Sequence, residues 1–219
     1  MRPIVKVIAI LGLALGGAIA AHSAELICSS SSNVRASHQS TPSARFVINT
    51  SNASVAIDKL TGMMWERCSL GFTFQANAAG VAHCVDSGTT NRFSWRDALS
   101  AAQAIRDQAS AVVPVLHNRY GDWRVPTMKE LSTIIEFQCW DPSVNLSVFP
   151  DTQAGPYWTS TPAEDAVAIV AHVVDFFSGG ISIQNSAPQS SLNINQLSYV
   201  RLVRTCKAEV DCPGMPTAQ

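Results

Sequence analysis

The chain has 219 residues, of which 47% are hydrophobic and only 14% are charged, with a formal net charge of −1. This length suits one domain, alone or with a targeting segment. The hydrophobic share excludes a disordered polymer, and the lack of a G-x-y run excludes a collagen-like fibre. No cluster of lysine and arginine is present that would neutralise phosphates, so nucleic acid is not expected as a partner.

Residues 1–24 have the pattern of a secretory signal peptide. Arg2 and Lys6 precede an uncharged apolar run from Val7 to Ala20, and Ala18-Ile19-Ala20 has the A-x-A form of a cleavage site. The run has about 14 residues, short of the roughly 20 that span a bilayer, so we expect cleavage and no membrane insertion afterwards. The remaining chain loses two positive charges and no negative one, which gives a formal charge of −3.

The six cysteines predict disulfide bonds in an exported protein. Their even number fits complete pairing, and 15 connectivities are open. No C-x-x-C pair is present, which argues against a zinc ribbon or a thioredoxin-type redox site. All six lie beyond the signal segment, at Cys28, Cys68, Cys84, Cys139, Cys206 and Cys212.

The first half of the chain predicts a polar leader followed by short strands. Residues 25–44 are Ser-rich and predict an extended leader tied down by Cys28. The segment between Cys68 and Cys84 is rich in Gly and Ala and shows no core pattern of its own. Alternating apolar residues predict strands at 45–49, 53–58 and 63–66, with turns near Asn52 and at 58–62.

Two capping patterns predict two helices. Ser94-Trp95-Arg96-Asp97 places a hydroxyl and a carboxylate where they can satisfy the first backbone N–H groups of a helix. Thr127-Met128-Lys129-Glu130 repeats the pattern directly after Pro126. Helical spacing gives the first helix an apolar face of Trp95, Ala98, Leu99, Ala102 and Ile105, and the second a stripe of Leu131, Ile134 and Ile135.

Beyond Pro142 the pattern changes to strands, with a hairpin turn at Gly179-Gly180. Strands, then two helices, then strands again is an α+β order. The strands are expected at 157–161, 167–177, 181–185 and 197–205.

Several motifs together resemble the Lcl C-terminal domain family, which takes its name from a collagen-like bacterial surface protein. The longest matches are Asp58-Lys59-Leu60-Thr61-Gly62-Met63-Met64-Trp65, Gly121-Asp122-Trp123-Arg124-Val125-Pro126-Thr127-Met128-Lys129-Glu130-Leu131 and Tyr199-Val200-Arg201-Leu202-Val203-Arg204. Shorter ones are Trp95-Arg96-Asp97-Ala98-Leu99, Phe149-Pro150 and Tyr157-Trp158-Thr159-Ser160-Thr161. Met63, Val125 and Thr159 are mild departures from the family pattern.

The resemblance implies a C-type-lectin-like fold, in which two helices pack on an antiparallel sheet and the first and last strands meet. It places this domain at residues 45–206, with 207–219 as a tail. It also implies three disulfides, Cys68–Cys84, Cys28–Cys139 and, in the tail, Cys206–Cys212. The named member takes part in adhesion and binds sulfated glycans, but its collagen-like repeats are absent here.

Most motif residues are expected to be structural. Arg124 and Glu130 flank a helix start, where an Arg–carboxylate pair is more often structural than catalytic. Trp65, Trp95 and Trp158 are expected in the core. Of the three, Trp158 is the one whose polar neighbours most favour surface exposure, where its ring could stack on a sugar. The structural set is Trp65, Trp95, Trp123, Arg124, Pro126, Glu130, Arg201 and Arg204.

The sequence nominates no catalytic centre and no cofactor. The five histidines lack metal-ligand spacing, and there is no G-x-S-x-G motif. Asp151, Glu164 and Asp165 are the loop carboxylates that could hold calcium, but the calcium motifs of C-type lectins are absent, so no metal is expected.

We therefore expect an exported, non-catalytic binding or adhesion module of the bacterial cell envelope, with an extracellular glycan as its ligand. The alternative is a structural component of an envelope or surface appendage that binds another protein through an exposed apolar patch near Phe72, Phe74 or Phe176-Phe177. The residues expected to contact a glycan are Trp158, Asp165, Asn185, Gln189, Asn193 and Asn195.

Overall fold

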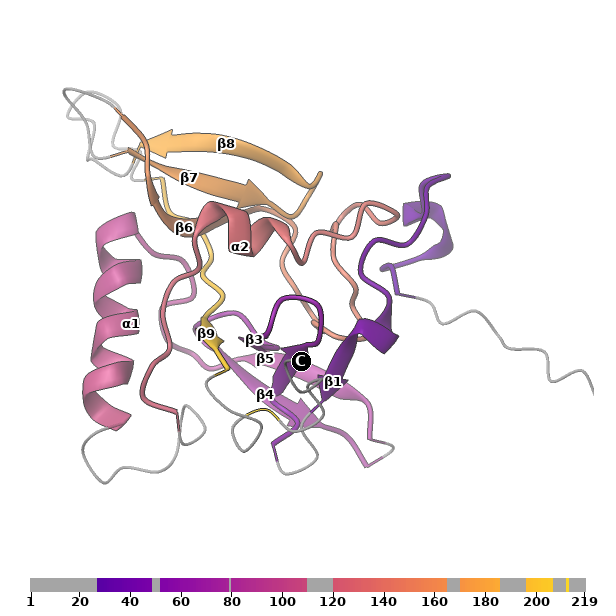
Figure 1. Cartoon of the computed structure of the whole chain (residues 1–219), viewed down its shortest axis with the longest axis horizontal. Helices are drawn as coiled ribbons and strands as arrows, with labels where there is room; N and C mark the ends of the chain where they lie inside the picture. Colours follow the sequence, from indigo (N-terminus) through magenta and orange to yellow (C-terminus); the bar gives the residue numbers. More distant parts are fainter. Residues whose placement is uncertain are drawn as a thin grey trace, which may run out of the picture.

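The computed structural model describes residues 27–48, 52–78, 80–109, 120–164, 170–185, 196–206 and 212. Strands come first, two helices follow, and strands resume, so the α+β prediction is confirmed (Figure 1). The elements are β1 (Phe46–Ile48), β2 (Val55–Asp58), β3 (Met63–Glu66), β4 (Phe72–Ala76), β5 (Ala82–Asp86), α1 (Trp95–Ala109), α2 (Met128–Ser132), β6 (Pro156–Pro162), β7 (Val170–Asp175), β8 (Gly180–Asn185) and β9 (Val203–Thr205).

The strands form three antiparallel sheets. The first has the order β1-β2-β3-β9, so the last strand lies beside one of the first, with Met63 opposite Thr205. The second is the meander β6-β7-β8, and the third is the hairpin β4-β5. Figure 1 shows α1 at one side of the molecule, the β6-β7-β8 sheet across the top, and the first described residues at the other side.

The turn between β2 and β3 is fixed by the Asp-x-x-Thr-Gly motif. The Asp58 carboxylate is fully buried and accepts hydrogen bonds from the Leu60 N–H, at 3.0 Å, and the Thr61 hydroxyl, at 2.6 Å. Arg45 donates to the same carboxylate from its Nε at 2.7 Å. Gly62 follows with φ 69°, a conformation that costs glycine little. This motif therefore closes a hairpin.

Both predicted helix starts are confirmed. The Asp97 N–H donates to the Ser94 hydroxyl, which itself donates to the Asp97 carboxylate. At α2, Thr127 and Glu130 form a full capping box, in which each side chain accepts from the other's backbone N–H. A capping residue of this kind stabilises a helix by about 1 kcal/mol.

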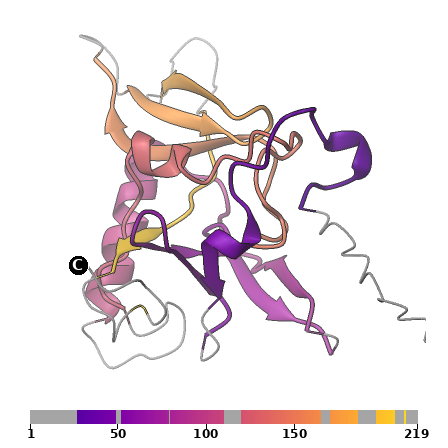
Figure 2. The ribbon, with the colours of Figure 1, turned by 45° about the vertical axis from the view of Figure 1, so that its right-hand side comes forward.

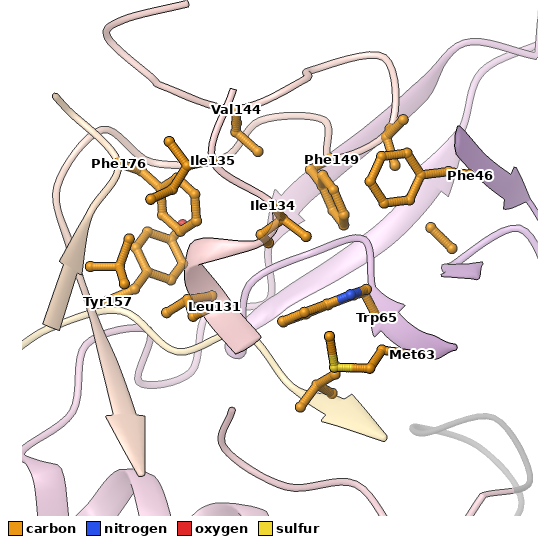
Figure 3. Close-up of a cluster of buried hydrophobic side chains, with 14 residues drawn as sticks. Phe46, Met63, Trp65, Leu131, Ile134, Ile135, Val144, Phe149, Tyr157 and Phe176 are labelled. Carbon is orange, nitrogen blue, oxygen red and sulfur yellow. The ribbon is translucent and has the colours of Figure 1, made fainter. Parts of the chain in front are cut away.

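The core consists of two apolar clusters on opposite faces of β6 and β7. Val174 belongs to the cluster that α2 covers, whereas its neighbour Val173 belongs to the cluster beside α1. Figure 3 shows the first cluster, where Trp65, Leu131 and Phe149 meet below α2. Because successive residues of a strand point to opposite faces, a strand between two clusters is apolar throughout.

The described part of the leader is a packed segment, tied down at more points than the expected attachment at Cys28. The Glu136 carboxylate is fully buried and accepts hydrogen bonds from the backbone N–H and hydroxyl groups of Ser40 and Thr41. A fifth bond comes from the Gln138 N–H at 2.8 Å. Figure 2 shows this segment lying along the loop that follows α2.

The three disulfides are Cys28–Cys139, Cys68–Cys84 and Cys206–Cys212, which is the pairing that the resemblance implied. Three disulfides are typical of a protein in an oxidising compartment, outside the cytosol. Among the residues that the structure describes, no helix is both long and apolar enough to span a bilayer.

The segment between Cys68 and Cys84 lacks a core pattern, as expected: it contains β4 and the start of β5, and most residues of this hairpin are exposed. One sequence expectation for local structure is wrong, because within the expected strand 197–205 only β9 is a strand. The preceding backbone bonds to several partners, for example from Leu70 N–H to the Val200 carbonyl and from Glu66 N–H to the Leu202 carbonyl.

Candidate functional site

The motif tryptophans belong to the interior. Trp65, Trp123 and Trp158 are fully buried, and Trp95 is half-buried with its indole N–H donating to the Thr159 carbonyl at 2.7 Å. The Trp158 indole donates to the Phe93 carbonyl, also at 2.7 Å. Trp158 therefore lies in the core, as was expected of the motif tryptophans. Its selection as a residue that stacks on a sugar is wrong, because β6 is covered on both faces.

Arg124 and Glu130 form a two-pronged ion pair at the start of α2. The two guanidinium nitrogens lie 2.7 and 2.8 Å from the two carboxylate oxygens. Burial alone would raise the pKa of Glu130, but the bonds from Arg124 and Thr127 outweigh it and hold that pKa below its usual range. Glu130 is thus an ionised structural anchor. Pro126, between the two, accepts a bond from the Ser160 N–H.

The two motif arginines near the end of the chain are also structural. Arg201 is fully buried, with its guanidinium donating to the Glu66 carbonyl at 2.8 Å and to the Thr152 hydroxyl at 2.7 Å. Arg204 pairs with Asp122, with Nε 2.6 Å from the carboxylate. These side chains join the last strand to β3 and to the loop before α2.

Of the predicted ligand residues, the structure places two. Trp158 is buried, and Asn185 is half-buried at the end of β8, opposite Val170. Asp165, Gln189, Asn193 and Asn195 lie outside the described residues. Because Val170 begins β7, Asn185 lies where the β6–β7 connection joins the sheet.

A groove of about 600 Å³ lies between α1 and the segment that leads into α2. Its apolar lining is made of small or aliphatic side chains, and its polar lining comes mainly from the outer face of α1. The lining residues are Leu99, Ser100, Ala102, Gln103, Ala104, Arg106, Asp107, Arg124, Val125 and Ser160. Sequence analysis singled out Arg124 and placed Leu99 and Ala102 on the apolar face of the helix. It missed the polar residues of α1, whose pattern matches an ordinary solvated helix face.

The groove offers hydrogen-bonding groups of both kinds. Gln103 bridges its neighbours, accepting from Arg106 and donating to the Asp107 carboxylate at 2.8 Å. Neither histidine nor cysteine lines the groove. Within the described ranges there is also no group of three His, Cys, Asp or Glu side chains that could hold a metal. This arrangement suits the binding of a polar ligand better than proton transfer.

The carboxylates considered for calcium have other surroundings. Asp151 accepts a bond from the Cys84 N–H at 2.7 Å and lies 3.7 Å from Nδ1 of His83. Glu164 is exposed at the end of β6, and Asp165 is outside the described residues.

Exposed apolar residues gather away from the groove. Phe176 is fully buried, which contradicts the expected patch at that residue, whereas Phe177 is 46% exposed. Ile181 and Ile183 on β8 are 50% and 58% exposed. Trp140, which sequence analysis did not single out, is partly exposed and forms an edge-to-face pair with Phe177.

These features define a disulfide-linked α+β domain whose characteristic motifs form its core, caps and turns. The family model of the Lcl C-terminal domain matches residues 54–204, more than half of the chain. The chain therefore belongs to this family, whose domains are surface-related or secreted. No curated protein and no solved structure matches it.

Proposed function

We propose that this protein is an exported, non-catalytic binding or adhesion module that recognises extracellular glycans at the bacterial cell envelope. The observation that carries the proposal is the groove beside α1, with its polar walls and small apolar floor. A hydroxyl-rich chain needs donors and acceptors in close alternation. Arg106 donates, Asp107 accepts, and Ser100 and Ser160 can do both.

The same groove supports a binding role over catalysis. A general acid at neutral pH needs a raised pKa, and a nucleophile needs an adjacent base. Glu130, the carboxylate paired with Arg124 beside the groove, instead has a lowered pKa. Arg124 has a raised pKa because it bonds to Glu130, so it stays cationic. Two groups that are held ionised and paired with each other are not poised for proton transfer, which supports a binding role for the groove.

The C-type-lectin-like fold is part of this proposal. Pairing of β9 with β3 supports it, because the fold brings its first and last strands together. The two helices on antiparallel strands also support it.

A second candidate function is that of an envelope or appendage component that binds another protein. The observation in its favour is β8, which lies at the edge of its sheet and exposes Ile181 and Ile183. Native edge strands are usually protected by a charge, a proline or a bulge. β8 has neither charge nor proline, and its six residues pair with β7 in regular register.

The test is binding of residues 25–219 to neutral and sulfated polysaccharides, with calcium and with EDTA. Arg106→Ala in the groove should weaken binding at least several-fold. Arg96→Ala, an exposed arginine on the same helix outside the groove, is the matched control and should bind as the parent does. An absence of binding to any glycan would refute the glycan proposal, and a pull-down with Ile183→Lys would then test the protein alternative.

A further inference from the structure

A second surface, at the opposite side of the molecule from α1, presents two aromatic rings. The ring centroids of Trp140 and Phe177 lie 6.0 Å apart with an angle of 85° between the planes. Phe177 is 46% exposed, and Trp140 is partly exposed. Figure 1 shows the described start of the chain, which packs beside Trp140, on the side away from α1.

Trp140 differs from the tryptophans of the motifs in what its indole does. The N–H groups of Trp95 and Trp158 are used by backbone carbonyls inside the fold. The indole N–H of Trp140 makes no hydrogen bond within the described part of the chain, although it lies at the surface. A surface donor next to an apolar ring face is available to a ligand that has hydroxyl acceptors.

Polar residues lie next to the two aromatic residues in the chain or contact their neighbours. The Arg35 guanidinium contacts the Ser178 carbonyl at 3.4 Å, so it lies against the residue that follows Phe177. Gln138 and Asp141 are neighbours of Trp140, and their side chains form no hydrogen bond to any residue that the structure describes. Gln138 and Asp141 thus lie within two residues of Trp140 in the sequence, and Arg35 contacts the residue after Phe177. The side chains of Gln138 and Asp141 can form hydrogen bonds to a ligand.

Three distant segments hold this surface rigidly. The Trp140 N–H donates to the Asn33 carbonyl at 3.1 Å, and the Arg35 N–H donates to the Gln138 carbonyl at 2.6 Å. The Asp141 N–H donates to the Phe177 carbonyl at 2.9 Å. The Cys28–Cys139 disulfide ends one residue before Trp140. A site whose parts are fixed before binding loses less conformational entropy when the ligand arrives.

We propose that Trp140 and Phe177, with Arg35, Gln138 and Asp141, form a binding subsite for a neutral pyranose ring. The apolar C–H face of the sugar packs on the indole, and adjacent ring hydroxyls bridge the carboxylate, the amide and the guanidinium. The inference rests on the proposed glycan-binding function for its ligand class, but it concerns a different surface from the groove.

The close alternation of rings with polar groups of both signs favours a sugar over a protein surface. A protein interface centre is depleted in charged residues. Here Asp141 follows Trp140 in the chain, and the Arg35 guanidinium contacts the residue after Phe177. A neutral sugar also needs no net charge on its site, and these two side chains have opposite charges.

The experiment is affinity electrophoresis and calorimetry of residues 25–219 with neutral polysaccharides and oligosaccharides, namely glucan, mannan, galactan and chitin fragments. Trp140→Ala and Phe177→Ala should weaken binding roughly tenfold, the loss expected when one aromatic contact of about 1.4 kcal/mol is removed. Asp141→Asn is the conservative variant. Asp141 has φ 50°, which asparagine tolerates, so this variant keeps the fold and removes the charged acceptor.

The controls separate this inference from the proposed function. Leu60→Ala removes another exposed apolar side chain, 75% exposed at the β2–β3 turn, and should leave binding unchanged. If Arg106→Ala abolishes binding of a neutral sugar while the Trp140, Phe177 and Asp141 variants bind normally, the subsite is refuted and the glycan function stands. If the parent protein binds none of the neutral sugars, the subsite is refuted; if it binds no sulfated one either, the glycan function fails as well.

Discussion

A substitution at Glu136 tests how the segment around Ser40 and Thr41 is attached to the rest of the domain. The Glu136 carboxylate is fully buried and has no cationic partner among the residues that the structure describes, so five hydrogen bonds from Ser40, Thr41 and Gln138 stabilise the charge. Glu136→Gln keeps the shape but replaces one acceptor oxygen by an NH₂ group. The least costly orientation points this group at Thr41, whose hydroxyl can turn to accept while its N–H is left unpaired.

The expected loss can be estimated from these contacts. One buried, unpaired N–H costs about 1–3 kcal/mol, and the remaining bonds lose the strength that the negative charge gave them. The total is about 2–4 kcal/mol of unfolding free energy, or roughly 5–15 °C in Tm for a domain of this size. Urea unfolding at neutral pH measures it, and Glu164→Gln, at an exposed residue, is the control.

The pH dependence of this difference provides the refutation. Burial acts to raise the pKa of Glu136, but the bonds from Ser40, Gln138 and Thr41 outweigh it, so its folded pKa lies below the usual 4.5. A lowered folded pKa stabilises the fold above the unfolded pKa, and this stability is lost as pH falls through the folded value. The stability difference between the parent and Glu136→Gln should therefore shrink as pH falls from the unfolded pKa through the lowered folded pKa of Glu136. A loss under about 0.5 kcal/mol at pH 7 would refute the argument.

Three further changes test other parts of the fold. Arg201→Lys should lower the free energy of unfolding, measured in urea, by about 3 kcal/mol, because an ammonium group cannot reproduce the forked guanidinium that bonds several buried oxygens. A loss near zero would mean that water satisfies these oxygens. Removing Cys28 and Cys139 together by serine should cost about 4–5 kcal/mol, since the link closes a loop of 111 residues, and an unchanged Tm would contradict this. Thr127→Ala should cost about 1 kcal/mol through its lost capping bond to Glu130, whereas no change would show that α2 is held by packing alone.

The elements that the sequence predicts well are those fixed by hydrogen bonds between residues close together in the chain. The caps at Ser94 and Thr127 and the turn at Asp58 each depend on side chains that bond to backbone within three residues. These hydrogen bonds do not depend on the tertiary contacts of the rest of the chain. For the same reason the apolar face of α1 was predictable, and Ala98, Ala102 and Ile105 are buried as expected.

The elements that sequence missed depend on distant partners. The β4-β5 hairpin has little apolar alternation because most of its residues are exposed, and the Cys68–Cys84 disulfide attaches the middle of β5 to the segment before β4. Polar neighbours gave Trp158 a claim to exposure, but it is fully buried in the cluster that includes Ala98 and Ala102 of α1. Trp140 pairs with Phe177, which is 37 residues further along the chain. No local pattern could have indicated that.

The motif residues that identify the family have structural roles. Asp58 closes a turn, Trp65 and Trp123 fill the core, and the fully buried Arg201 joins the segment before β9 to the end of β3. Residues committed to such bonds cannot also contact a ligand. Membership in the family therefore predicts the architecture, and a search for the ligand must turn to surfaces outside the motifs: the polar face of α1 and the rings of Trp140 and Phe177. If the two proposals hold, variants at these surfaces will alter binding without touching the core, and will separate recognition from folding.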